Sequence, residues 1–236
     1  MITRLIKTIP FLYTVALSVK HSIWKIRTKK AFNEYLKNTD APKLQLGAGL
    51  NALPGWFNTD YFARPAIPFL DVTKKFPFPD NTFELVFSEH HIEHITYLQA
   101  QAMLAEAYRV MKPGGYIKIS TPDLQKYVQA YATKNLHSPM VKQHVTDWIY
   151  GGFAYAANYK PVNDSYEAHF VNDIFLNYEH RFIYDYNALS ALLEKAGFIN
   201  INDPAASYTG FQKIDSHVTD FDRAFTLYLC AEKPVG

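Results

Sequence analysis

The sequence of 236 residues has only one cysteine, Cys230, and no apolar run long enough to cross a membrane as a helix. A single thiol excludes an internal disulfide and any metal site built from several cysteines, which fits a reducing compartment. The apolar stretch between Lys7 and Lys20 has twelve residues, whereas a spanning helix needs about 20. We therefore expect a cytoplasmic protein without a transmembrane helix.

The sequence also lacks a strong excess of charge. Its net charge is +2 and 19% of its residues are charged, so no global field favours nucleic acid as a partner. The basic excess is confined to residues 1–38, which contain a single acid, Glu34. The basic residues of this segment are Arg4, Lys7, Lys20, Lys25, Arg27, Lys29, Lys30 and Lys37.

No internal repeat or low-complexity tract is visible, and short apolar strands alternate with helices after residue 42. This alternation predicts an α/β fold with a Rossmann-like, mostly parallel sheet of seven strands, the last of them antiparallel. Apolar residues at helical spacing between the fourth and fifth strands predict a helix that ends at residues 112–114. Asp185 as its start and Gly197 as its end predict a second helix. The expected strands are 43–49, 56–62, 67–72, 83–90, 114–121, 198–201 and 225–233.

A long segment, residues 123–184, fits no ordinary connection within the domain of residues 41–236. It is rich in aromatic residues, and we expect a cap over the carboxyl edge of the sheet. Its tyrosines either form an ordinary hydrophobic cap or an aromatic cage for a cation. They are Tyr150, Tyr155, Tyr159, Tyr166 and Tyr178.

The first predicted strand ends in Gly47 and Gly49, which would let a ligand approach the backbone. Pro54 and Gly55 then prevent the long helix that holds a pyrophosphate in dinucleotide sites. Acidic residues follow successive strands: Asp60, eleven residues after Gly49, then Asp71 and Glu89. Carboxylates repel phosphates but suit ribose hydroxyls, an adenine amine and a cation, a combination that S-adenosylmethionine offers.

The motifs LQLGAG, NTD, LDVTKKFPFPDNTFELVFSEHHIEHI, EAYRVMKPGGYIKISTPD and LEKAGF together resemble those of the class I, Rossmann-like S-adenosylmethionine-dependent methyltransferases. The likeness is strongest to the small bacterial methyltransferase-11-like group, over residues 42–122 and 185–233. One departure is Gln45, where this family often has an acid. The resemblance implies S-adenosylmethionine as cofactor, bound by Leu46, Gly47, Ala48, Gly49, Asp60, Tyr61, Asp71, Val72, Ser88, Glu89 and His90.

Each of these residues has an implied role. The glycines would face the methionine moiety, Asp60 the ribose hydroxyls, and Asp71 with Val72 the adenine. Residues 88–90 would line the sulfonium side.

The histidines were weighed separately. His90 and His94 in HHIEH are four residues apart and superficially suggest a metal site, but no further ligand is evident elsewhere, so we expect no metal. His180, in YEHRFIYD, lies where the family brings residues toward the acceptor. A neutral imidazole there could serve as the general base, or it could be a structural histidine bonded to a carbonyl.

Residues 1–40 are expected to form a basic, amphipathic helical segment whose apolar positions are Leu12, Ala16, Val19, Ile23 and Ile26. Three interpretations remain open: a lid packed on the domain, a helix lying on anionic lipid, and a protein interface. The second would give peripheral membrane contact through residues 1–38. The basic start and short apolar run also imitate a signal peptide.

The expected activity is methyl transfer in small-molecule biosynthesis, with an acceptor that is a sugar or a lipid-linked precursor. No signature of a DNA methylase follows the fourth strand. Two alternatives use the same residues differently. One is a cyclase or lyase that consumes the cofactor and releases methylthioadenosine, and the other is a membrane-associated binding module without catalysis.

Overall fold

The structure, a computed structural model, describes residues 10–133, 139–146, 166–176, 179–202 and 224–236. Its centre is a six-stranded sheet with the order β2-β1-β3-β4-β6-β5. The strands β2, β1, β3 and β4 are parallel, and β6 runs antiparallel to both of its neighbours. The α/β class and the antiparallel last strand are thereby confirmed. The strands are β1 Lys43–Leu46, β2 Phe57–Thr59, β3 Phe83–Glu89, β4 Met111–Pro122, β5 Ile199–Asn202 and β6 Thr226–Glu232.

The strand expected at residues 67–72 is reduced to an isolated bridge between Asp60 and Phe69. The amide of Asp60 donates to the carbonyl of Pro68 at 3.1 Å, and the amide of Leu70 donates to the carbonyl of Asp60 at 2.9 Å. Pro68 has no N–H with which to extend this ladder. The described residues therefore contain six strands and the remnant of the seventh.

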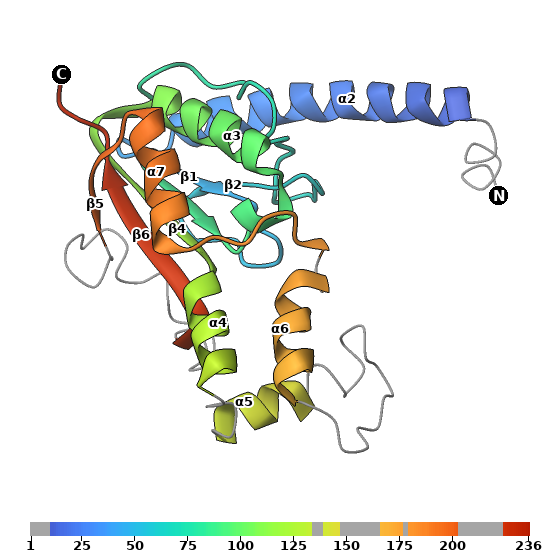
Figure 1. The fold of residues 1–236 in the computed structure, drawn as a ribbon. Helices are drawn as coiled ribbons and strands as arrows, with labels where there is room; N and C mark the ends of the chain where they lie inside the picture. Colours follow the sequence, from blue (N-terminus) through green and yellow to red (C-terminus); the bar gives the residue numbers. More distant parts are fainter. Residues whose placement is uncertain (1–9, 134–138, 147–165, 177–178, 203–223) are drawn as a thin grey trace.

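Two helices cover one face of the sheet (Figure 1), and both have the caps that their sequences predict. α3 (Tyr97–Val110) begins with a capping box between Thr96 and Gln99. α7 (Tyr186–Ala196) begins where the Asp185 carboxylate accepts the amide of Ala188 at 2.8 Å, and it ends at Gly197 with φ of 101°. Their apolar stripes pack together and onto the sheet, forming the main core.

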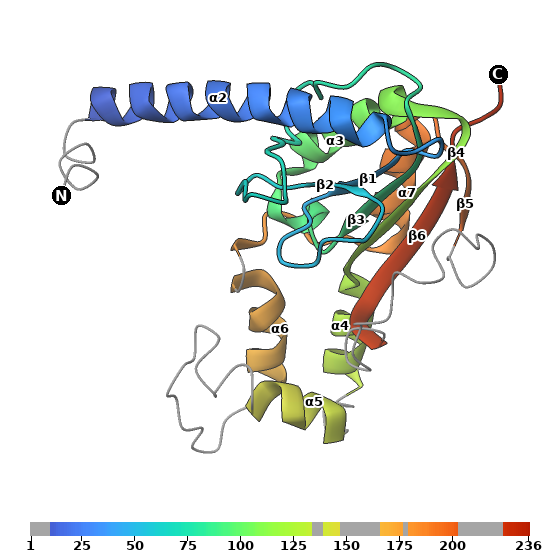
Figure 2. The ribbon, with the colours of Figure 1, turned by 180° about the vertical axis from the view of Figure 1, so that it is seen from behind.

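The N-terminal helix, α2 (Pro10–Leu36), packs on the domain only through its later turns, and its first turns project beyond the sheet in both views (Figures 1 and 2). Trp24 contacts the Phe69 ring, the Thr28 hydroxyl donates to the Phe69 carbonyl at 2.9 Å, and Phe32 enters the main core. None of the described helices is both long and apolar enough to span a lipid bilayer.

The aliphatic positions expected to form the apolar face of α2 do not pack on the domain where their side chains are described. Ile23 is 47% exposed and Ile26 is 72% exposed. The packed face is instead set by aromatic contacts, because Phe32 lies among the rings of Phe57, Phe78 and Phe83. When a helix has both an aliphatic and an aromatic face, the face that fits the core sets its orientation. The spacing of aliphatic residues in the sequence does not show which face that is.

Within residues 123–184 three helices are described: α4 (Leu124–Ala132), α5 (Pro139–His144) and α6 (Tyr166–Leu176). They lie together beyond one end of the sheet (Figures 1 and 2). A second cluster of buried side chains joins α4 and α6 to the strand that ends the chain. Of the five tyrosines considered for a cage, the described residues include only Tyr166, and only its backbone. The buried members of this second cluster are Tyr127, Val141, Val145, Phe170, Ile174, Ile183 and Phe225.

A single arginine ties α3 to the loop before β3. The Arg109 guanidinium donates to both carboxylate oxygens of Glu106, at 2.9 and 2.6 Å, and to the carbonyls of Phe76 and Phe78. The amide of Phe76 in turn donates to Glu106 at 2.7 Å. Partial burial alone would raise the pKa of Glu106, but these hydrogen bonds and the charge of Arg109 hold it below its usual value.

Lys233, just after β6, makes several contacts at the amino edge of the sheet. Its ammonium donates to the side chain of Asn81 and to the carbonyls of Tyr108 and Met111, each within 2.9 Å. It also lies 4.6 Å from the centre of the Tyr108 ring. Burial lowers the pKa of this lysine.

Candidate functional site

The glycine loop after β1 lies at the carboxyl edge of the parallel strands, where open α/β sheets hold their ligands. Gly47 and Gly49 have φ of 66° and 52°. A Cβ at Gly47 would lie 2.3 Å from Cγ of His91, so the histidine ring fills the space that this glycine leaves. At Gly49 no described atom lies within 4 Å of the corresponding position. The loop is therefore closed at its first glycine and open at its second.

Asp60, directly after β2, faces this loop. Its carboxylate accepts the amide of Gly49 at 2.9 Å and the amide of Phe62 at 2.7 Å. Arg64 donates to the carbonyl of Gly49, so the loop is held from both sides. The prediction that Asp60 and Gly49 share a site is consistent with this contact.

Gln45, the departure from the family pattern, is 1% exposed and holds the chain that follows the glycines. Its amide nitrogen donates to the carbonyl of Asn51 at 3.0 Å, and its oxygen accepts the amide of Leu53 at 3.3 Å. A carboxylate could not make the first of these bonds. The neutral side chain is thus explained by the loop that it supports.

Five further residues are predicted to bind the cofactor. Leu46, Ala48 and Val72 are buried, and Tyr61 is 43% exposed against the rings of Phe62 and Phe69. Asp71 caps its own turn, accepting the amide and the hydroxyl of Thr73 at 3.0 and 2.7 Å. These contacts place Asp71 at the same edge as Asp60 but give it a structural task.

The end of β3 carries Ser88, Glu89 and His90. Ser88 is fully buried, and its hydroxyl has no hydrogen-bond partner among the described residues. His90 has φ of 42°, which turns the chain sharply after the strand. Its Nε2 lies 3.1 Å from the hydroxyl of Thr226 and its Nδ1 lies 3.3 Å from Oε1 of Glu93.

Glu93, in the short 3₁₀-helix η1 (Ile92–His94), is fully buried beside this turn. Its Oε2 accepts the hydroxyl of Thr121 at 3.1 Å, whereas Oε1 has no aligned hydrogen-bond donor among the described residues. Burial opposes the charged form, but His90 and the nearby imidazoles hold the pKa of Glu93 below its usual value. Burial, and then the charge of Glu93, raise the pKa of Tyr184.

His180 comes from a distant part of the chain and joins this cluster. Its Nδ1 lies 2.5 Å from the carbonyl of Ile174, and its ring packs edge-on against His94, with centroids 4.9 Å apart. One ligand atom each of Glu93, His94 and His180 lie within 4.8 Å of one another. Burial lowers the pKa values of His180 and of the neighbouring His91.

The sequence pairs His90 with His94 in HHIEH and indicates no partner elsewhere, whereas the structure brings His180 beside Glu93 and His94. The missing information was the fold, because residues 93 and 180 are brought together when the amides of Arg181 and Phe182 donate to the carbonyl of Glu93, at 2.6 and 3.2 Å. No sequence motif predicts such a backbone contact.

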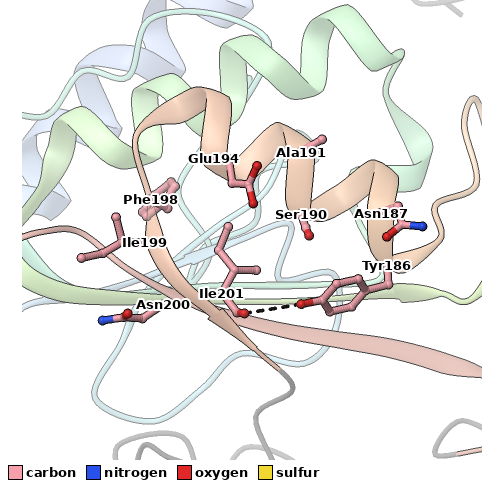
Figure 3. Close-up of a pocket in the computed structure, with 9 residues that line it drawn as sticks. All are labelled: Tyr186, Asn187, Ser190, Ala191, Glu194, Phe198, Ile199, Asn200 and Ile201. Atoms are coloured by element: carbon pink, nitrogen blue, oxygen red, sulfur yellow. Dashed lines mark hydrogen bonds between the residues drawn. The ribbon is translucent and has the colours of Figure 1, made fainter.

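The described surface also has cavities away from this edge. One of about 580 Å³ lies between α7 and β5 (Figure 3), where the Tyr186 hydroxyl donates to the carbonyl of Ile201 at 3.5 Å. Another, of about 360 Å³, lies between α2 and the loop of residues 63–69. None of the predicted cofactor residues lines either cavity.

The chain is similar to known proteins over part of its sequence, and to solved structures at low identity. Residues 61–119 match the family described as "Methyltransferase domain". A SAM-dependent methyltransferase from Thermotoga maritima shares 15% identity over 92% of this chain and 97% of its own, with a TM-score of 0.44. Phosphoethanolamine N-methyltransferase 2 of Haemonchus contortus, solved with S-adenosyl-L-methionine, shares 14% identity over 83% of this chain and 49% of its own, with a TM-score of 0.42.

No curated protein matches the chain. The family match runs from the residue after Asp60 through most of β4, and so covers the end of β3, the histidine turn and α3. It contains both the loop of residues 76–80 and Arg109, which the structure joins. The matched domain and the sheet order agree with the prediction of a class I, Rossmann-like methyltransferase that uses S-adenosylmethionine.

Proposed function

We propose that this protein transfers the methyl group of S-adenosylmethionine to a small-molecule acceptor, a sugar or a lipid-linked precursor. The observation that carries the proposal is that the glycine loop with Asp60 and the cluster containing His180 lie at the same edge of the sheet. The first provides a place for a nucleoside without phosphates. The second provides polar groups for an acceptor beside it.

The residues at the edge fit such a cofactor. Gly49 leaves open space where a side chain would otherwise stand, and the Asp60 carboxylate beside it suits ribose hydroxyls. Ser88 offers a buried hydroxyl without a described partner. The remaining proposed contacts are the backbone at 46–48, Tyr61, Asp71 with Val72, Glu89 and His90. Gly47 fits less simply, because the His91 ring already occupies its open side.

When bound, the sulfonium supplies an activated methyl group, so the protein's main task is alignment and exclusion of water. We assign the acceptor side to His180. With Nδ1 directed at the Ile174 carbonyl, Nε2 of the neutral ring is the nitrogen that can accept a proton from an acceptor hydroxyl. The helices of residues 123–184 would form the cap that excludes water.

The experiment that tests the proposal is incubation of the full chain with S-adenosylmethionine, alone and with pooled sugar and lipid-linked acceptors, followed by mass spectrometry. We expect S-adenosylhomocysteine and a product 14 Da heavier only when an acceptor is present, the mass change of replacing H by CH₃. Enzyme-dependent methylthioadenosine without an acceptor would instead mean that the cofactor is itself the substrate. No binding of the cofactor would leave only the non-catalytic alternative.

Asp60→Asn is the matched variant for this assay. It keeps the shape and one acceptor oxygen for the amides of Gly49 and Phe62, but it removes the charge that would bind the ribose. Loss of a charge-assisted hydrogen bond costs about 1.5–3 kcal/mol, so we expect the dissociation constant of S-adenosylmethionine to rise roughly 10-fold to 150-fold. Unchanged affinity would reject the placement of the ribose at Asp60.

One observation favours peripheral membrane contact as a second role. Ile23 and Ile26 are exposed on α2, and the neighbouring Lys25, Lys29 and Lys30 are exposed as well. Aliphatic and basic side chains on one projecting helix suit anionic lipid. Co-sedimentation with vesicles that contain phosphatidylserine tests this role. Ile23→Ser with Ile26→Ser should weaken sedimentation without changing stability, and equal sedimentation would argue for a lid.

A further inference from the structure

We propose that Glu93, His94 and His180 form a binding site for a divalent transition-metal ion of the Zn²⁺ type. One ligand atom from each residue lies within 4.8 Å of the other two. Two imidazole nitrogens and one carboxylate oxygen are a donor set that Zn²⁺ and similar ions accept, whereas Mg²⁺ and Ca²⁺ prefer oxygen alone.

A second, independent observation points to a cation at this place. The side chain of Glu93 is 1% exposed, and its Oε1 lacks an aligned hydrogen-bond donor among the described residues. A buried carboxylate carries a large desolvation penalty, which a bound cation would offset. Among the described residues, Oε1 lies 3.3 Å from Nδ1 of His90, which offsets this penalty only when that ring is protonated.

The contacts behind the three donors are those that orient metal ligands. His180 directs Nδ1 at the carbonyl of Ile174, so in the neutral ring the lone pair is on Nε2. The Thr121 hydroxyl donates to Oε2 of Glu93 at 3.1 Å, which fixes the carboxylate plane. The amides of Arg181 and Phe182 hold η1 against the segment that carries His180.

The three donor atoms must move closer together to bind one ion. Donors at about 2.0–2.1 Å from a tetrahedral ion lie about 3.4 Å apart, so the present spacing must shrink by up to about 1.5 Å. Side-chain rotation of the half-buried His94 and His180 would have to supply this closure. Three protein donors leave a position open to an outside ligand. The inference goes beyond the proposed function, because binding would stand whatever the acceptor is. With the ion bound, the His180 lone pair is a metal donor, so His180 could serve as general base only in the metal-free protein.

The test is equilibrium dialysis of the metal-stripped full chain against Zn²⁺, with elemental analysis and without any cofactor. We expect about one ion per chain, little competition from millimolar Mg²⁺, and visible absorption bands when Co²⁺ replaces Zn²⁺. His94→Gln and Glu93→Gln should each weaken binding at least about 100-fold, since even loss of a supporting contact costs 10-fold to 100-fold.

Two further variants separate ligation from a general effect on folding. Thr121→Val keeps the shape but removes the hydroxyl behind Glu93, and it should weaken binding about 10-fold. His169→Gln, on α6 and outside the cluster, should bind Zn²⁺ like the wild type. Circular dichroism checks that each variant is folded, and the Co²⁺ spectrum provides a second reading if Glu93→Gln is unstable.

Failure of this inference is distinguishable from failure of the proposed function, because neither the dialysis nor the spectra require methyl transfer. Absence of stoichiometric Zn²⁺ in the wild type would overturn the inference. Equal affinity in the wild type and in folded His94→Gln would do so too, since the ion would then be held by other histidines.

Discussion

At the scale of single residues, the two glycines of the loop after β1 differ although their backbone angles are alike. Both have positive φ, so alanine at either position carries a backbone cost of about 1 kcal/mol. Only at Gly47 would the new Cβ also meet the His91 ring, at 2.3 Å. Substitution at Gly47 therefore tests packing against His91, whereas substitution at Gly49 tests whether a ligand occupies the open space.

We predict that Gly47→Ala lowers the free energy of unfolding by about 2–4 kcal/mol, because strain and displacement of His91 add together. Gly49→Ala should cost only about 1 kcal/mol but should weaken S-adenosylmethionine binding by 10-fold or more, because the methyl group enters the open space. Urea denaturation and calorimetric titration measure the two effects. If Gly49→Ala bound the cofactor normally, the ligand would not approach the loop there.

At the scale of elements, the connection of α3 to the loop before β3 is electrostatic. Arg109 remains charged throughout the accessible pH range, because its hydrogen bond to Glu106 raises its pKa. The pH dependence of this connection therefore comes from Glu106. Its side chain is 19% exposed, so screening by solvent is limited.

Glu106 has a folded-state pKa below its unfolded value of about 4.5, so its stabilisation is complete above that value and is lost as the pH falls through the folded pKa. We predict that Glu106→Gln lowers the free energy of unfolding by about 1–2 kcal/mol at pH 7 and by much less near pH 3. Denaturation curves at both pH values test this. A constant difference between variant and wild type would show that the hydrogen-bond geometry matters and the charge does not.

The helix α2 makes a second prediction at this scale. Phe32→Ala should lower the free energy of unfolding by about 3–5 kcal/mol, because it empties a place among three aromatic rings. Ile26→Ala should change it by less than about 0.5 kcal/mol, because that side chain is 72% exposed. Similar losses for both variants would mean that the two faces of the helix are equally engaged.

Much of the fold could be predicted because local rules and tertiary packing agree. The caps at Asp185 and Gly197 bound α7, and apolar residues at helical spacing form the buried face of α3. Arg109, in the stretch YRVMKPGG, donates to the carbonyls of Phe76 and Phe78 in FPFPD, so the two motifs form one structure. Contacts between a side chain and a distant backbone carbonyl produce no periodic pattern in the sequence.

The errors have physical causes too. The third expected strand fails because Pro68 cannot donate a ladder bond, although its neighbours alternate as in a strand. The face of α2 was assigned from aliphatic spacing, whereas Trp24 and Phe32 decide its orientation. The assignments of the cofactor residues remain predictions, and His180 could not be linked to Glu93 without the fold.

At the scale of the whole molecule, the buried side chains fall into unequal groups. Among the described residues, the main core joins the sheet with α3, α7 and the end of α2, while a much smaller cluster joins α4 and α6. Regions with little buried apolar area open at lower free energy than the rest of the protein. The helices beyond the carboxyl edge should therefore open without unfolding the sheet.

Hydrogen exchange followed by mass spectrometry tests this expectation. Amides of α4 and α6 should exchange at least about 10-fold faster than those of β1, β3 and β4, which corresponds to a difference of about 1.4 kcal/mol in opening free energy. Phe170→Ala, which removes a fully buried ring from the small cluster, should widen this gap. Uniform exchange across the helices and the sheet would show that the molecule opens as one unit.

The position of Lys233 at the amino edge of the sheet has a practical consequence for measurements on this protein. Because β6 is antiparallel and pairs Glu232 with Tyr116 near the start of β4, the chain leaves the sheet at the edge opposite the glycine loop and the histidine cluster. A fluorophore or an immobilising peptide fused downstream would therefore be held away from the site. Surface-based binding assays can use this attachment point without obstructing entry of nucleoside, acceptor or metal ion.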